Sequence, residues 1–193
     1  MNEQIILASK SPRRIELMRQ HGFNPVVFPS QADENLPDFI TPQAAVMYLA
    51  FLKAWDVTRS YTDEATTTNT YTVIGSDTVV VYDNKIIGKP TSKVDAFNTL
   101  SALRSNSHQV ITGVCIIKIN GSNITKECFY ETTDVYFTDY SDEELKAYVE
   151  TDEPYDKAGG YAIQGTFGKY IDHFDGDYDN VVGFPISRVI EYF

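Results

Sequence analysis

The sequence predicts an α/β fold in a single domain that spans residues 1–193, and three observations favour it. A chain of 193 residues is long enough for one ordinary α/β domain and short for two independent ones. Hydrophobic residues make up 42% and charged residues 22%, which is typical of a globular protein and excludes a disordered or collagen-like chain. Apolar runs typical of strands alternate with helical patterns along the chain.

The first third of the chain predicts two strands and two helices. A short apolar run over 5–8 indicates a strand, and Pro12 opens a helical pattern that ends at Gly22. Residues 25–28 form a second expected strand, followed by an acidic loop. Thr41 is then expected to cap a helix that begins at Pro42 and extends to about Val57.

The middle of the chain begins with a threonine-rich stretch, Tyr61–Thr72, which we predict to be an exposed loop without chemistry. A strand is expected from Val73 to Val81, with a polar interruption at residues 75–78. The turn at 83–85 leads into a returning strand at 86–88, so this region predicts a hairpin.

The remaining elements alternate between helix and strand. Helices are expected at 93–103 and from Asp142 to about Thr151, where Ser141 and Glu144 form a capping box. Strands are expected at 110–119 and 127–137. The last segment is glycine-rich from Pro154 and ends in a short helix near Val189.

Charge and hydropathy exclude several classes of function. The formal net charge is -11, so the summed field repels polyanions and argues against a general nucleic-acid-binding role. No apolar run is long enough to cross a membrane, and the first ten residues lack the features of a secretory signal. We therefore expect a cytoplasmic protein whose anion site, if any, is local.

The two cysteines, Cys115 and Cys128, flank a turn at residues 120–122 and could face each other across a hairpin. In a reducing compartment, two small buried apolar residues are the favoured interpretation and a disulfide is the alternative.

A local anion site is predicted at residues 9–14, Ser-Lys-Ser-Pro-Arg-Arg, at a junction between strand and helix. Backbone N–H groups at a helix start and nearby guanidinium groups bind phosphate oxygens, and hydroxyls orient them. A solvated basic first turn is the plain alternative, but cations there oppose the helix dipole. The same string also resembles a site for a proline-directed kinase, a pattern with many false positives.

Asp77 lies between β-branched apolar residues, where an unpaired carboxylate would be costly. It is a candidate metal ligand or general base, and an Asp that caps a turn or bulge is an equally good interpretation. Lys53 and Lys89, taken singly, are typical of solvated lysines.

A further cluster, residues 153–165, mixes charged residues with glycines, as expected where backbone approaches a ligand closely. Its alternative is a glycine-rich surface turn. The three histidines are isolated, and His108 is expected to be structural.

Taken together, these motifs resemble the Maf family of nucleoside triphosphate pyrophosphatases over nearly the whole chain. The similar segments, in family order, are 7–14, Asp33-Glu34, 75–80, Gly88-Lys89-Pro90, 108–114, 156–165 and 176–185. The last two resemble the branch that acts on dTTP and UTP. The chain departs from the family pattern by lacking a glycine before His108 and by having Gly160 and Phe184.

The resemblance implies hydrolysis of a nucleoside triphosphate between its α and β phosphates, in nucleotide-pool housecleaning. It implies a central mixed, twisted sheet flanked by helices, similar to inosine triphosphatases, and a homodimer. Two alternatives remain open: a modified-purine triphosphate as substrate, or a nucleotide-binding regulator of cell division with little turnover.

The resemblance also implies roles for ten residues. Asp77 would be the general base, and with Glu34 it would organise Mg²⁺ or Mn²⁺. Substrate-binding residues would hold the triphosphate or read the base: Ser9, Ser11, Arg13, Arg14, Lys53, Thr78, Lys89 and Gln164.

Overall fold

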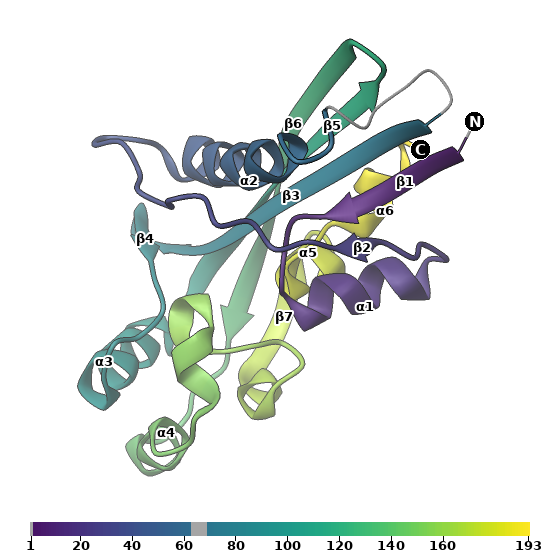
Figure 1. Cartoon of the computed structure of the whole chain (residues 1–193). Helices are drawn as coiled ribbons and strands as arrows, with labels where there is room; N and C mark the ends of the chain where they lie inside the picture. The colour runs from purple at the N-terminus through teal and green to yellow at the C-terminus, as the bar shows by residue number, and fades with distance from the viewer. Residues whose placement is uncertain (1, 63–68) are drawn as a thin grey trace. The chain divides into compact units, whose positions relative to one another are not determined.

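A computed structural model describes residues 2–62 and 69–193 and confirms the α/β class with a mixed sheet flanked by helices (Figure 1). The chain divides into two compact units. Unit 1 holds the chain up to Asp77, residues 112–131 and the end from Gly183; unit 2 holds residues 78–111 and 132–182. Strands β3 (Asn69–Tyr82), β5 (Ser107–Asn120) and β6 (Asn123–Phe137) contribute to both units. The single-domain assignment and the inosine-triphosphatase-like arrangement stay predictions.

Unit 1 contains the parallel pairs β1–β2 and β1–β3 together with the β5–β6 hairpin, with strands in the order β2-β1-β3-β5-β6. Strand β1 (Asn2–Leu7) pairs in parallel with β2 (Val26–Val27) on one side and with β3 on the other. Helix α1 (Pro12–Gln20) connects β1 to β2, as a parallel pair requires a crossover.

The expected start of β3 was wrong by four residues. Of the predicted loop, residues 63–68 lie outside the described residues, and Asn69–Thr72 belong to β3. The reason is tertiary: β1 pairs with this segment from Asn2 opposite Asn69 to Leu7 opposite Ile74, and Thr72 is buried. The polar residues at 75–78 do not interrupt the strand.

Helix α2 (Pro42–Thr58) starts as predicted, because the Thr41 side chain accepts a hydrogen bond from the Ala44 N–H at 3.3 Å. It lies very close to the sheet at two glycines. A Cβ on Gly75 of β3 would lie 2.2 Å from the Ala50 carbonyl oxygen, and one on Gly113 of β5 would lie 2.3 Å from that of Val46. Only glycine allows the helix to approach this closely.

The two faces of the unit 1 sheet carry different helices (Figure 1). On the α2 side, Ala50, Ala54 and Val57 pack with buried residues of β1, β3 and β5. The other side carries α1, which buries Leu17 and Met18, and the short helix α6 (Ile186–Ile190).

Unit 2 contains the antiparallel pairs β3–β4 and β6–β7, and its strands lie in the order β4-β3-β5-β6-β7. The predicted hairpin between β3 and β4 (Lys85–Ile87) is confirmed, and Asp83 and Asn84 in its turn have φ of 50° and 59°. Asp and Asn tolerate this left-handed conformation better than other non-glycine residues. Strand β7 (Ile171–Asp175), which pairs with β6, was not predicted because its segment lacks a long apolar run.

The helices of unit 2 begin at capping residues. The Ser92 side chain caps α3 (Lys93–Leu103), and the predicted capping box starts α4 (Asp142–Val149). Three 3₁₀ turns and a short helix follow: η1 (Glu153–Asp156), η2 (Ala158–Gly160), η3 (Thr166–Tyr170) and α5 (Tyr178–Val182). The segment expected to be one glycine-rich stretch is thus built of short turns.

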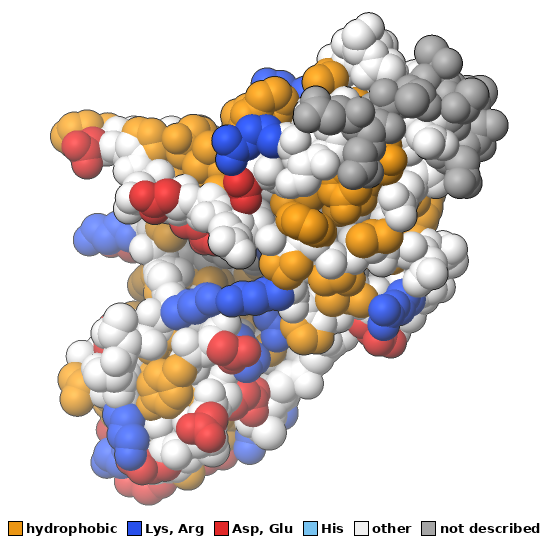
Figure 2. Space-filling view, viewed as in Figure 1, with side chains coloured by type: hydrophobic (Ala, Val, Ile, Leu, Met, Phe, Trp, Pro, Cys, Tyr) orange, Lys and Arg blue, Asp and Glu red, His pale blue; other side chains and the backbone are white. Residues whose placement is uncertain are grey.

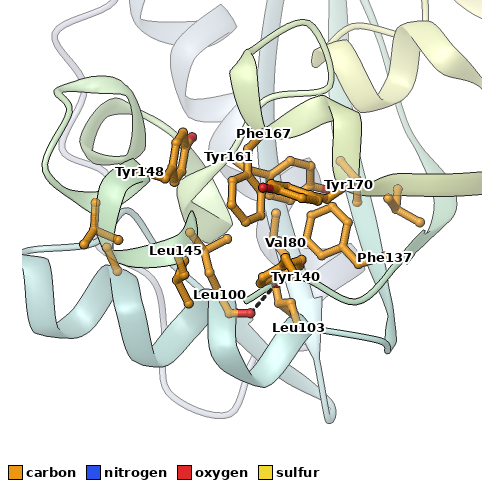
Figure 3. Close-up of a cluster of buried hydrophobic side chains, with 14 residues drawn as sticks. Val80, Leu100, Leu103, Phe137, Tyr140, Leu145, Tyr148, Tyr161, Phe167 and Tyr170 are labelled. Carbon is orange, nitrogen blue, oxygen red and sulfur yellow. Dashed lines mark hydrogen bonds between the residues drawn. The ribbon is translucent and has the colours of Figure 1, made fainter. Parts of the chain in front are cut away.

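The core of unit 2 is rich in aromatic rings (Figure 3). Phe137 packs edge-on against Tyr161 with ring centroids 4.8 Å apart, and Phe167 packs against Tyr140 at 5.0 Å. The Tyr140 hydroxyl donates a hydrogen bond to the Leu100 carbonyl oxygen, which satisfies a polar group inside this core.

Replacement of Gly75 by Ala should destabilise the protein, because the added methyl group meets the α2 backbone. We expect a loss of about 3 kcal/mol in the free energy of unfolding, measured by urea titration. Gly88→Ala is the matched control, since nothing lies within 4 Å of a Cβ at that glycine. Equal stability of the two variants would contradict the close packing of α2 on β3.

Candidate active site

The predicted anion-binding segment lies where β1 passes into α1. Ser9 is buried, and its side-chain oxygen accepts a hydrogen bond from the Ser11 N–H at 3.2 Å. Ser11 is the N-cap of α1, but its own side chain caps no N–H group of the helix. The two hydroxyls and the helix start therefore lie together, as the sequence predicts, and Arg13 follows in the first turn.

Arg14 joins three segments of unit 1. Its Nε donates to the Gly183 carbonyl oxygen at 2.9 Å, and its Nη1 donates to the Ser76 carbonyl oxygen at 2.8 Å and to Ser9 Oγ at 3.3 Å. Burial lowers the pKa of Arg14, while the negative charge of Asp77 opposes that shift. The guanidinium is thus fixed beside the Asp77 strand rather than extended into solvent.

Lys53 lies between two carboxylates. Its Nζ donates to Asp77 Oδ1 at 2.6 Å and is 3.2 Å from Glu34 Oε1. The side chains of Lys53 and Asp77 are only 13% and 14% exposed, so their ion pair is screened little by water. The prediction that Lys53, taken singly, is a solvated lysine was wrong.

The backbone explains why Lys53 reaches Asp77. Lys53 lies on α2 directly before Ala54, whose backbone nitrogen would lie 2.7 Å from a Cβ on Gly75. Asp77 is two residues after Gly75 on β3, and alternate residues of a strand share a face. The glycine contact therefore places the lysine and the aspartate on the same side of the sheet.

Glu34 reaches the Lys53 ammonium from the segment between β2 and α2, and the Glu34 side chain is 58% exposed. Figure 2 shows hydrophobic side chains over this segment and α2. They include Leu36 and the fully exposed Phe39, whose φ is 60°.

The donor chemistry around Lys53 suits a hard cation. Asp77 and Glu34 are oxygen donors that already converge on one positive charge. Within residues 2–62 and 69–193, no group of three His, Cys, Asp or Glu side chains could hold a metal ion. Two carboxylates leave the remaining coordination positions of such an ion to water or to a ligand.

Three of the predicted residues, Thr78, Lys89 and Gln164, belong to unit 2. Thr78 follows Asp77 directly on β3. Lys89 is exposed after β4, and the neighbouring Gly88 carbonyl oxygen accepts a hydrogen bond from the Gly159 N–H at 3.0 Å. The segment that carries Lys89 is therefore joined to the glycine-rich segment.

The glycines of that segment are needed for their conformation. Gly159 and Gly160 have φ of 71° and 77°. A Cβ on Gly159 would lie 2.9 Å from a Val80 methyl group, and one on Gly160 would lie 3.1 Å from Pro90. Close approach of backbone within unit 2 explains these two residues.

Glu153 holds the segment around Gln164, a role that the sequence patterns did not predict. Its carboxylate accepts hydrogen bonds from the Thr166 N–H at 2.9 Å and from the Thr166 hydroxyl at 2.7 Å. Gln164 is exposed two residues before Thr166. Gly165 leaves room for this carboxylate, because a Cβ on Gly165 would lie 1.9 Å from Glu153 Oε1.

His108 is structural, in agreement with the sequence. It is buried, its Nε2 lies 2.5 Å from the Tyr161 hydroxyl, and its ring packs against Phe137. Burial lowers the pKa of His108 from 6.5 to about 4, so the ring is neutral at pH 7.

Comparison with known proteins adds to this geometry. Residues 4–193 match the family described as Maf-like protein. The chain belongs to this family. A relative of this Maf-like chain from Agathobacter rectalis is named dTTP/UTP pyrophosphatase; it is 44% identical over 97% of this chain and 95% of its own length. A second relative of that name, from Geobacillus sp. (strain WCH70), is 42% identical over 97% of this chain and 95% of its own length.

Among solved structures, the Ham1 protein of Staphylococcus aureus is similar to this Maf-like chain with a TM-score of 0.43 and 18% identity. The similar region covers 72% of this chain and 73% of that one. In the described part of the Maf-like chain, no helix is both long enough and apolar enough to cross a membrane.

The stability of the protein should depend on His108 below neutral pH. In the unfolded chain the ring binds a proton near pH 6.5, whereas in the folded protein it does so only near pH 4. The stability that the protein gains by holding a neutral ring is therefore complete above pH 6.5. It is lost as the pH falls toward 4, because the unfolded chain then binds a proton that the folded protein does not. Between pH 7 and pH 5 this amounts to about 2 kcal/mol in the free energy of unfolding.

Urea titration of the wild type and His108→Asn at both pH values checks this expectation. The variant should be less stable at pH 7 and should lose less stability on going to pH 5. His21→Asn, at an exposed histidine of unit 1, is the control variant. An unchanged pH dependence in His108→Asn would contradict the buried neutral ring.

Proposed function

We propose that this chain hydrolyses dTTP, UTP and related or modified pyrimidine nucleoside triphosphates. The bond broken lies between the α and β phosphates, and the products are the nucleoside monophosphate and pyrophosphate. Support comes from the relatives named dTTP/UTP pyrophosphatase, which align along nearly their whole length. The enzyme is then a hydrolase that acts on an acid anhydride.

The observation that carries the proposal is the Lys53 ammonium held between Asp77 and Glu34, beside the Arg14 guanidinium. In a chain of net charge -11, this is a local concentration of paired charges of both signs. Cations bind phosphate oxygens, and carboxylates bind metal ions or accept protons from water. Phosphoryl chemistry needs both kinds of group in one place.

Asp77 is assigned as the general base for the attacking water. In the structure its Oδ1 is held by Lys53, which fixes the carboxylate in position before substrate arrives. When a triphosphate binds, Lys53 turns to its oxygens and leaves Asp77 able to accept a proton. Arg14, Lys53 and Lys89 bind the triphosphate and offset the charge that moves to the leaving pyrophosphate.

Ser9 and Ser11 orient phosphate oxygens from the start of α1. Their hydroxyls add hydrogen bonds without adding charge, so they orient the phosphate oxygens and leave the net charge of the site unchanged. Ser9 also accepts from Arg14 Nη1, which couples the hydroxyl to the guanidinium.

Glu34 and Asp77 are assigned as ligands of a divalent cation, Mg²⁺ or Mn²⁺. The two carboxylates fit such an ion, and phosphate oxygens of the substrate would complete its coordination. The bound ion would neutralise charge on the reacting phosphates.

Arg13, Thr78 and Gln164 are assigned to recognition of the base. The Gln164 amide offers both a donor and an acceptor, as a pyrimidine edge requires. Glu153 keeps the Gln164 segment in place through Thr166.

In the cell, the activity would remove noncanonical or excess pyrimidine nucleotides before incorporation, in the cytoplasm. The partner is the small-molecule triphosphate, not a nucleic acid or a membrane. A homodimer is part of the proposal, and light scattering of the purified protein tests it.

Asp77→Asn should lower the rate of pyrophosphate release from dTTP and UTP by at least about 100-fold, because loss of a general base typically costs that much. The assay uses dTTP, UTP, CTP, dUTP, GTP, ITP and methylated nucleotides, each with Mg²⁺ or Mn²⁺. Asp83→Asn is the matched control, because Asp83 lies in an exposed turn with φ of 50°, which Asn adopts easily. The activity of the Asp83→Asn variant should equal that of the wild type.

Each other outcome of this assay has a defined meaning. Pyrophosphate release from purine triphosphates alone would support the proposed reaction but would show that the substrate is a purine and not a pyrimidine nucleotide. Tight binding without release from any nucleotide would support a regulatory nucleotide-binding protein and overturn the enzyme. Equal rates for Asp77→Asn and the wild type would remove Asp77 from the reaction.

Gln164→Leu should reduce kcat/KM for dTTP and UTP by about 10- to 100-fold, since a hydrogen-bonding partner of the base is lost. The loss should be smaller for nucleotides that the wild type hydrolyses poorly. Gln20→Leu, at an exposed glutamine of α1, serves as the control. A uniform loss across all nucleotides would argue against base recognition by Gln164.

A further inference from the structure

The two cysteines of the chain lie on paired strands of unit 1. Cys115 is on β5 and Cys128 is on β6, each six positions from the two-residue turn Gly121-Ser122 that joins the strands. Equal separation from a tight turn places the two residues opposite each other in the antiparallel pair. Figure 1 shows this hairpin as neighbouring arrows.

Their sulfur atoms are in contact. The Cys128 and Cys115 Sγ atoms lie 2.8 Å apart, within hydrogen-bond distance, and both cysteines are free thiols. Facing residues of an antiparallel pair have Cα separations within the range that a disulfide spans. The backbone therefore needs little movement to join the two sulfurs.

The two thiols differ in access to solvent. Cys115 is fully buried, whereas Cys128 is half-buried. Cys115 packs in the core with Ala50 and Ala54 of α2, and Cys128 lies at the edge of that core with Phe51 and Tyr61. A small oxidant can thus meet Cys128 first.

The surroundings of the two thiols also give them different pKa values. The hydrogen bond to Cys115 lowers the pKa of Cys128, and the nearby Lys126 ammonium lowers it further. The bond to Cys128 and burial raise the pKa of Cys115. These directions and the greater exposure of Cys128 favour Cys128 as the thiolate of the pair.

We propose that Cys115 and Cys128 form a reversible thiol–disulfide site that takes a hydroperoxide as its oxidant. Cys128 is the attacking thiol and Cys115 the resolving thiol. The site is separate from the proposed pyrophosphatase chemistry and does not depend on it.

The reaction proceeds in two balanced steps. The Cys128 thiolate attacks one oxygen of hydrogen peroxide, the O–O bond breaks, and sulfenic acid and hydroxide form. The Cys115 sulfur then attacks the Cys128 sulfur, and the S–O bond breaks as the S–S bond forms. The hydroxyl group leaves with the Cys115 proton as water, so two thiols are oxidised while the peroxide is reduced to water.

The consequence for the fold is a covalent bond across the β5–β6 hairpin, against the core on which α2 packs. A thiol reductant such as dithiothreitol reverses it by thiol–disulfide exchange. In the reduced protein, Cys115 is a small buried residue of that core, as expected from the sequence, whereas Cys128 is only half-buried.

Treatment of the whole protein with hydrogen peroxide tests the proposal, with intact mass and peptide mapping as readouts. The wild type should lose the mass of two hydrogen atoms, yield a Cys115–Cys128 crosslinked peptide and return to its original mass with dithiothreitol. Cys115→Ser should instead keep a sulfenic acid on Cys128 that dimedone labels. Cys128→Ser should react at least about 10-fold more slowly than Cys115→Ser, because its remaining thiol is buried and protonated.

Three results would overturn the proposal. The wild type could keep both thiols under peroxide that labels Cys115→Ser. It could accumulate dimedone-reactive sulfenic acid on Cys128 without a disulfide, which would show that Cys115 does not resolve it. The two single variants could also react at equal rates, which would remove the assignment of attacking and resolving thiol.

Discussion

The close contact of α2 with the sheet is the constraint on which the site of unit 1 depends. Gly75 and Gly113 lack side chains where α2 crosses β3 and β5, so the helix backbone comes within van der Waals contact of the strands. Lys53 on that helix thereby reaches Asp77 on β3. A bulkier residue at either glycine would move the cation away from the carboxylate, because protein interiors are close-packed and transmit such shifts.

Charge pairing explains how a strongly acidic chain keeps cations in this region. Arg14 is bound by the carbonyl oxygens of Ser76 and Gly183, and Lys53 is bound by two carboxylates. Desolvation of a guanidinium or an ammonium is costly unless such partners are present. The same partners fix both groups in position.

Unit 2 achieves order by a different route. Its core is rich in aromatic rings, and close contacts at Gly159 and Gly160 bring short segments together. Glu153 then holds Thr166 and with it the exposed Gln164. The two units thus share strands of a mixed sheet but hold their site residues differently. Unit 1 relies on a helix packed closely on the sheet, and unit 2 relies on glycine-rich turns.

The sequence by itself determined the α/β class, the starts of α2 and α4 through their caps and the β3–β4 hairpin, and it indicated the motif residues of the candidate site. These follow from local signals: Thr41 and Ser141 at helix starts, and Asp83-Asn84 in a turn. Only the tertiary structure decided the start of β3, the existence of β7 and the partners of Arg14 and Lys53. Strand pairing and ion pairs join residues far apart in the chain, so local propensity carries no record of them.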